Sequence, residues 1–233
     1  FIIFMGIFWS NTFVNIFVVM MAMSIFTSST LPLAESLTLA HLKANKADSK
    51  YSHIRLWGSI GFIVAALSLG VMIDSYGERS LIYALLITQL VIFFLAFILP
   101  EKKINFTKFN KRSIWPILKK REVIVLLLSC ALMVSSHGLL YNFYSIFLED
   151  QGYSGATIGL LWSVGVVFEI LIFLLMPKIL SKFTLKSVLL ISIAFAVLRF
   201  FLIGAYVDSI LILIAAQIMH AATFGSFHVA SIQ

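Results

Sequence analysis

The sequence predicts an all-α protein that crosses a membrane several times, and three observations support this fold class. Of the 233 residues, 61% are hydrophobic and 12% are charged, whereas a soluble domain is nearer half apolar and a quarter charged. Apolar stretches of about 17 to 25 residues recur, each long enough to cross a ~30 Å hydrocarbon layer as a helix. The basic residues gather in alternate polar segments, as the positive-inside rule requires. This composition excludes an ordinary soluble enzyme.

The apolar runs predict one short helix at about 1–9 and seven full spans. The expected spans are 12–40, 55–73, 80–100, 122–148, 155–176, 184–205 and 207–230. Helices are expected because the backbone in lipid must satisfy its own hydrogen bonds, and the runs are too long for barrel strands. The chain opens at Phe1 with a run too short to span and closes at Gln233 just after an apolar segment. We therefore expect it to be part of a longer protein.

The positions of the charges orient the spans. Segments 41–54, 101–121 and 177–186 hold three, eight and three basic residues, or 14 of the 17. The intervening segments hold only Arg79, beside several acids. We therefore expect these three segments to face the cytoplasm. The net charge of +7 follows from this topology, so no nucleic-acid partner is expected.

Segment 101–121 is the longest polar stretch and divides the chain into two parts of similar layout. We interpret 1–100 as part of an N-terminal helical bundle, 101–121 as a basic cytoplasmic linker, and 122–233 as part of a C-terminal bundle. A basic linker between two bundles is typical of transporters built from repeated halves. The linker itself is expected to be a solvated connector that anchors the topology.

Four charged residues fall within or at the edges of spans: Glu35, Arg55, Glu169 and Arg199. A charge at mid-bilayer costs roughly 2.5–3.5 kcal/mol or more unless it is paired or hydrated. Two acids and two bases suggest pairing across helices. Desolvation favours the neutral form of a carboxyl group and a nearby Arg favours the anion, so such a group can carry a proton. The alternatives are structural roles and, for Arg55, a side chain that reaches the cytoplasmic interface.

Other polar and aromatic residues share helical faces with these charges. Trp162 precedes Glu169 by seven residues, and His220 lies deep in the last span beside Gln217. His137, Tyr141 and Tyr144 form one stripe that lines a cavity or simply packs. The single Cys130 excludes an intrachain disulfide, and no catalytic triad, phosphate loop or metal-ligand spacing occurs in the sequence. We expect neither an enzyme nor a cofactor.

Three runs of sequence resemble the phenylpropionate permease group of the major facilitator superfamily. They are Tyr51 to Phe62, Gly152 to Ser154 followed by Gly159 to Glu169, and Gln217 to His220. The resemblance covers essentially the whole chain. It implies the twelve-helix fold of that superfamily, of which this chain would contain about eight helices, from the end of helix three to helix ten.

The same group is similar to the lactose permease, a sugar–proton symporter, and this resemblance implies a set of site residues. The spacings of Pro32 with Glu35 and of Arg55 with Gly58 match its substrate-binding helices four and five. Its acid on helix eight, Arg on helix nine and His on helix ten look like Glu169, Arg199 and His220. Thr223 stands where the permease has a carboxylate thought to carry the proton, which leaves open whether Glu169 or Glu35 serves instead.

From these observations we expect a secondary active transporter in the bacterial inner membrane, a monomer that couples a small organic substrate to protons by alternating access. The proton is the only coupling ion expected. Buried Arg residues suit an aromatic carboxylate such as phenylpropionate, whereas the Glu residues suit a sugar. The alternatives are a membrane-embedded enzyme acting on a lipid-type substrate and a passive channel. The candidate substrate-binding or proton-coupling residues are Glu35, Arg55, Glu169, Arg199, His220, His137, Tyr141 and Trp162.

Overall fold

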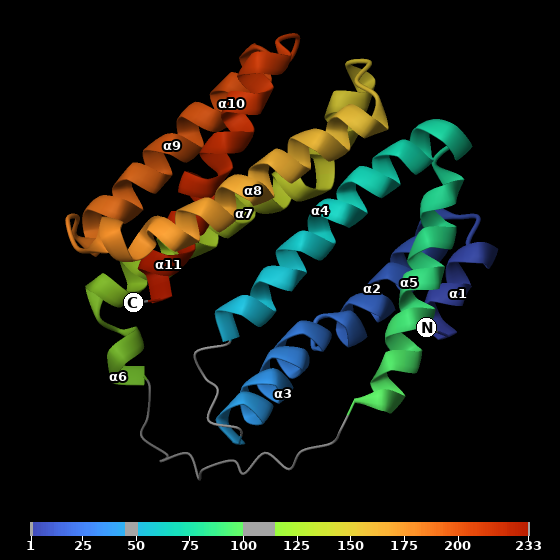
Figure 1. Cartoon of the computed structure of the whole chain (residues 1–233), viewed down its shortest axis with the longest axis horizontal. Coiled ribbons are helices and arrows are strands. Elements are labelled where there is room, and N and C mark those ends of the chain that lie inside the picture. The colour runs from blue at the N-terminus through green and yellow to red at the C-terminus, as the bar shows by residue number, and fades with distance from the viewer. Residues whose placement is uncertain (1, 45–50, 100–114, 233) are drawn as a thin grey trace. The chain divides into compact units, whose positions relative to one another are not determined.

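The described part of the chain folds into helices (Figure 1). The computed structural model describes residues 2–44, 51–99 and 115–232, and this described part contains no strand. The all-α fold is therefore confirmed. The elements are α1 (Ile2–Met5), the 3-10 helix η1 (Gly6–Trp9), α2 (Phe13–Thr27), α3 (Thr30–Ala44), α4 (Tyr51–Tyr76), α5 (Arg79–Ile98), α6 (Trp115–Leu118), α7 (Arg121–Asp150), α8 (Gly155–Leu180), α9 (Leu185–Ala205), α10 (Ile210–His220), the π-helix η3 (Ala221–Ser226) and α11 (Phe227–Ile232).

Within the described ranges, seven helical segments are long and apolar enough to cross a membrane, and each falls on a predicted span. Large apolar side chains are exposed along them; Phe17, Leu174 and Val197, for example, are 56%, 71% and 68% exposed. Contiguous apolar surface of this extent suits lipid tails and not water. The chain is a multi-pass membrane protein. The seven segments are Phe13–Leu42, Leu56–Tyr76, Arg79–Ile98, Arg121–Asp150, Gly155–Leu180, Leu185–Ala205 and Ile210–Ile232.

The first span, predicted as one helix over 12–40, is interrupted after Thr27, where α2 ends and α3 begins at Thr30. Pro32 has no N–H and cannot donate to the carbonyl of Ser28 four residues earlier. The hydroxyls of Ser28 and Ser29 donate to backbone carbonyls three residues earlier, which competes with the helical pattern. The missing donor and the competing hydroxyls explain the break.

The last span is also interrupted, because the six residues that follow α10 form the π-helix η3. A π-helix has more residues per turn than an α-helix, and such insertions are frequent at functional sites. Residues before and after η3 therefore do not follow a single helical periodicity. The sequence pattern predicted a continuous helix over 207–230 and did not predict this change.

The chain forms two compact units. One comprises Phe1–Trp57 and Tyr76–Phe109, and the other comprises Gly58–Ser75 and Asn110–Gln233. The α4 segment Gly58–Ser75 thus packs with the C-terminal helices. The division into an N-terminal bundle, a linker and a C-terminal bundle stays a prediction, and most of the predicted linker lies outside the described residues.

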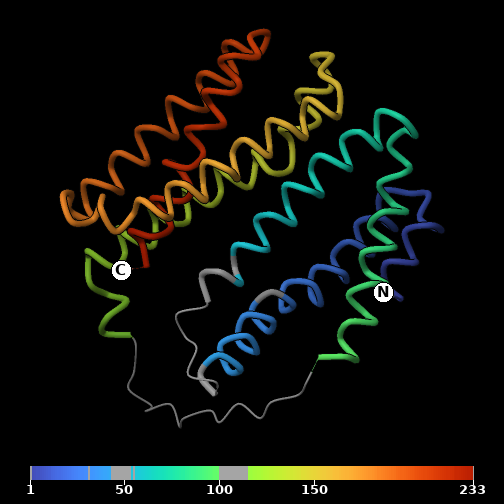
Figure 2. The backbone as a smooth tube through the Cα atoms, viewed as in Figure 1, coloured from blue at the N-terminus to red at the C-terminus, as the bar shows by residue number. Residues whose placement is uncertain are grey.

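In the second unit, α7, α8, α9 and α10 run side by side (Figure 2). Leu148, Leu161 and Leu213 are fully buried where these helices meet, and they form one apolar core with neighbouring side chains. Two smaller apolar clusters lie around Met133 and Met176. The polar residues described next are enclosed by this packing.

Candidate functional site

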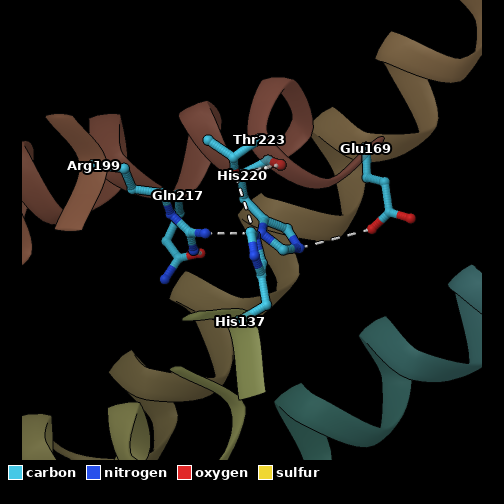
Figure 3. Close-up of polar contacts among 6 residues, drawn as sticks. All are labelled: His137, Glu169, Arg199, Gln217, His220 and Thr223. Carbon is cyan, nitrogen blue, oxygen red and sulfur yellow. Dashed lines mark hydrogen bonds and ion pairs between the residues drawn. The ribbon is translucent and has the colours of Figure 1, made fainter. Parts of the chain in front are cut away.

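Six polar residues from four neighbouring helices and η3 lie together inside the second unit (Figure 3). We call them the polar cluster: His137, Glu169, Arg199, Gln217, His220 and Thr223. Arg199, Gln217 and Thr223 are completely buried, and the two histidines are 2–3% exposed. Glu169 retains 17% exposure of its side chain. A buried charge is costly unless its hydrogen bonds are made. The hydrogen-bond partners of Arg199 therefore determine how well its burial is tolerated.

Arg199 projects from α9 toward α10 (Figure 3). Its Nη1 lies 3.0 Å from Nδ1 of His220, and its Nη2 donates to Oε1 of Gln217 at 3.3 Å. Its Nε is buried and has no hydrogen-bond partner among the residues that the structure describes. The guanidinium is thus held by two neutral groups, and its Nε–H stays available to another acceptor.

The contact with Arg199 determines the tautomer of His220. A guanidinium only donates, so Nδ1 of His220 accepts, and the neutral ring carries its proton on Nε2. That Nε2 lies 3.9 Å from Oε2 of Glu169 on α8. His220 therefore separates a cation on one side from a carboxylate on the other.

His137 on α7 has the opposite tautomer. Its Nδ1 lies 3.0 Å from the carbonyl oxygen of Met133, and a carbonyl only accepts, so Nδ1 carries the proton of the neutral ring. Its Nε2 faces the hydroxyl of Thr223 at 3.4 Å, and that hydroxyl also lies 3.1 Å from the carbonyl oxygen of His220. A hydroxyl has one proton to donate, so Thr223 can turn between these two acceptors.

Gly165 allows α8 to approach the polar cluster. A Cβ at this position would lie 3.1 Å from Oε1 of Gln217 and 3.5 Å from Cδ2 of His220. The hydroxyl of Tyr144 and Nε2 of Gln217 are also buried without a hydrogen-bond partner in the described part of the chain. Together with Nε of Arg199, this gives two such atoms in the polar cluster and one beside it, on Tyr144.

Aromatic side chains lie beside the cluster. The ring of Trp162 on α8 lies 5.8 Å from that of Tyr141 and 5.4 Å from that of Tyr144. The indole N–H of Trp162 donates to the hydroxyl of Ser145 at 3.0 Å. Tyr141 is 47% exposed, and its ring lies 6.3 Å from that of His220. These contacts form an aromatic wall next to His220.

The structure brings together six of the eight residues predicted from the sequence: His137, Tyr141, Trp162, Glu169, Arg199 and His220. Glu35 lies on α3, in the other compact unit, and is partly buried. The side chain of Arg55 lies outside the described residues. The predicted pairing of Glu35 with Arg55 therefore stays a prediction.

Three members of this region were not among the predicted site residues: Tyr144, Gln217 and Thr223. Gln217 precedes His220 by three residues and Tyr144 shares a face with His137, so helical spacing contained a signal for both. Thr223 follows His220 by three residues, but it lies in η3, where α-helical spacing does not hold. Its contact with His137 comes from packing.

No group of three histidine, cysteine or acidic side chains in the described ranges is arranged to hold a metal ion. The chemistry that the site offers is that of hydrogen bonds, one buried cation, one carboxylate and two titratable rings. Such a site can bind a polar solute and move a proton. Apolar spans that enclose an intramembrane cluster of this kind are typical of transporters.

The chain belongs to the MFS_1 like family of the major facilitator superfamily, whose family model matches residues 1–233. It is 30% identical over 232 residues to the "Probable 3-phenylpropionic acid transporter" of Escherichia coli (strain K12), covering 97% of this chain and 60% of that protein. The resemblance to the phenylpropionate permease group is confirmed.

Two further relatives are also named as transport proteins. The chain is 26% identical over 210 residues to the "Uncharacterized transporter YwbF" of Bacillus subtilis (strain 168), covering 89% of this chain and 52% of that protein. It is 26% identical over 156 residues to the "Maltose permease" of Geobacillus stearothermophilus, covering 66% and 38% respectively. The chain spans 60% or less of the length of these relatives. No solved structure matches it.

The family and the relatives indicate a transporter and not an enzyme. The alternative of a membrane-embedded enzyme is therefore set aside.

Proposed function

We propose that this protein is a secondary active transporter of the bacterial inner membrane that moves a small organic anion together with a proton. The observation that supports this most is Arg199, a buried cation held by two neutral partners with its Nε–H unused. In this proposal the protein works as a monomer, the proton is the only coupling ion, and 41–54, 101–121 and 177–186 face the cytoplasm. Access to the substrate alternates between the two sides of the membrane.

The first step is capture of a carboxylate by Arg199. A planar guanidinium binds carboxylates through two parallel hydrogen bonds, and a bond between opposite charges is about twice as strong as one between neutral groups. In this proposal, an anion that binds Nε and one terminal nitrogen draws the guanidinium away from the neutral partner of that nitrogen, which is His220 or Gln217. Displacement of His220 frees its Nδ1 from the donor that held it unprotonated.

The second step is protonation of the freed ring. The Nε2 of His220 already carries its proton, so a second proton on Nδ1 makes the ring a cation, and Oε2 of Glu169 lies 3.9 Å from Nε2 to stabilise it. While Arg199 donates to Nδ1, this protonation is blocked. Binding of the anion and uptake of the proton therefore favour each other, as reciprocal linkage requires of a symporter. The proton is shared by His220 and Glu169.

An aromatic carboxylate fits this site best. Arg199 supplies the charge for a carboxylate, and Trp162 and Tyr141 form the adjacent aromatic wall. The relative in Escherichia coli is named for 3-phenylpropionic acid. A sugar is the second candidate, because the Glu169 carboxylate and the Gln217 amide suit hydroxyl groups, and another relative is named a maltose permease.

The test uses the protein expressed from its complete gene and reconstituted in vesicles that contain a pH-sensitive dye. External 3-phenylpropionate should acidify the lumen, while the uncharged analogue 3-phenylpropanol should not. A signal with maltose alone would favour the sugar candidate. Acidification by none of the three solutes would contradict proton-coupled transport of this substrate class.

The matched variant is Arg199→Lys, which keeps the charge and loses the planar fork. We expect proton uptake driven by 3-phenylpropionate to fall by about tenfold or more. The thermal midpoint of the purified variant in detergent is the control for folding. Unchanged uptake by a folded Arg199→Lys variant would remove Arg199 from substrate binding.

A further inference from the structure

Two helices of the second unit, α4 and α8, meet backbone to backbone. A Cβ added at Gly70 of α4 would clash with the carbonyl oxygen of Gly155 of α8, and one added at Gly159 would clash with the carbonyl oxygen of Ala66. A Cβ at Gly155 would lie 2.7 Å from the carbonyl oxygen of Gly70. Side chains do not interdigitate at these points, so the helices can part there without repacking side chains into new rotamers.

An acidic side chain fastens this contact at one end. The Oδ1 of Asp74 accepts from the backbone N–H of Gly155 at 2.6 Å, and its Oδ2 accepts from that of Ala156 at 2.8 Å. These are the first two N–H groups of α8, which have no partner within the helix. The carboxylate also lies at the positive end of the helix dipole. Ser154 caps the same end by accepting from the N–H of Thr157.

Water can reach the two hydrogen bonds of Asp74, because Asp74 and Gly155 lie at the ends of their helices and both bonds are exposed. When the bonds break, water can solvate the carboxylate and the two N–H groups. The charge distribution places this end of α4 and α8 opposite the three basic segments, on the extracellular side. The contact is thus strong enough to hold two helices together and reversible enough to release them.

We propose that Asp74 is a releasable latch that closes the extracellular side of the transport path by holding α4 against α8. Release of Asp74 lets the glycine contact open toward the outside. The same helix α8 carries Trp162 and Glu169, and at Gly165 it touches Gln217 and His220, so its displacement reaches the polar cluster. This inference rests on the proposed transport function, since it assigns the latch to alternating access.

The test measures access from outside to a reporter thiol in the protein expressed from its complete gene. Cys130 is replaced by Ser, and Ser145→Cys places a thiol next to Trp162, which lies about 10 Å along α8 from Gly155. A membrane-impermeant maleimide is added to right-side-out vesicles. We expect slow labelling with Asp74 present and labelling about tenfold faster in Asp74→Ala, because two hydrogen bonds to a charged group are lost.

A second variant opens the contact without touching the acid. Gly159→Leu forces α4 and α8 apart and should also speed labelling, whereas Gly204→Leu should not, because no atom lies within 4 Å of a Cβ added at Gly204. Glu78→Ala is the matched acidic control, since the side chain of Glu78, at the start of α5, makes no capping hydrogen bond in the described structure. Asp74→Asn keeps one acceptor and should lie between the wild type and Asp74→Ala.

The latch and the proposed function fail in different ways. Equal labelling of the folded wild type, Asp74→Asn and Asp74→Ala would overturn the latch, whatever is found for proton uptake. Faster labelling of Asp74→Ala in vesicles where no solute drives proton uptake would support the latch and contradict the proposed symport. Faster labelling of Glu78→Ala to the same degree would also overturn the assignment to Asp74.

Discussion

Nη1 of Arg199 donates to Nδ1 of His220 across 3.0 Å, and this bond keeps the ring neutral with its remaining proton on the side of Glu169. The two residues are 21 positions apart and come from adjacent helices. Arg199 holds the His220 ring in its neutral form. A substrate anion that binds Arg199 would therefore release this ring for protonation. The relationship therefore connects substrate binding to proton binding in one contact.

Replacing Glu169 by Gln should abolish proton-driven accumulation of substrate. The amide keeps the size of the side chain but cannot stabilise a protonated His220 by its charge. Exchange of labelled for unlabelled substrate should persist if Glu169 carries the proton without holding the substrate. Uptake against a gradient and exchange are measured in the same vesicles. Accumulation at the wild-type level would remove Glu169 from the mechanism.

Replacing Thr223 by Val should destabilise the protein and slow transport. Valine has nearly the same shape but no hydroxyl, so Nε2 of His137 loses its partner at 3.4 Å. A buried polar group left without a partner costs about 1–3 kcal/mol. Thr223→Ser keeps the hydroxyl and should behave like the wild type. The thermal midpoint and the uptake rate report the two effects, and equal values for the Val and Ser variants would contradict a role for the hydroxyl.

Replacing Gly165 by Leu should displace Gln217 and His220. A Cβ added at Gly165 would lie 3.1 Å from Oε1 of Gln217, so a leucine side chain would be overpacked there. Overpacking typically costs about 1–3 kcal/mol. Gly204→Leu is the control because nothing lies within 4 Å of the added Cβ. We expect a lower thermal midpoint and weaker uptake for the Gly165 variant alone. Similar losses in both variants would mean that leucine in a helix, and not contact with the cluster, causes them.

The predicted pairing of Glu35 with Arg55 is tested by exchanging the two charges. Glu35→Arg and Arg55→Glu should each abolish uptake, because each leaves two like charges in an apolar setting. The double variant restores opposite charges and should regain a measurable part of the wild-type uptake rate. A double variant no more active than either single one, at equal expression, would speak against the pair.

The sequence by itself determined the membrane spans. Hydrophobicity is a property of each residue and its neighbours along the chain, so runs such as 80–100 and 184–205 could be recognised without knowledge of any contact. The charged and aromatic candidates Glu169, Arg199, His220 and Trp162 were found for the same reason, since a polar group in an apolar run is visible locally. The family resemblance came from short runs of the same kind.

Only the tertiary structure decided which of these residues meet. The bonds of Arg199 to His220 and Gln217, and of Thr223 to His137, depend on how each helix is rotated about its axis and on the close approach that Gly165 permits. The π-helix η3 changes that rotation in the last span, and α-helical spacing gives no sign of it. The bonds of Asp74 to α8 join residues 81 and 82 positions apart. Such contacts arise from packing between helices, and hydropathy along one helix does not encode them.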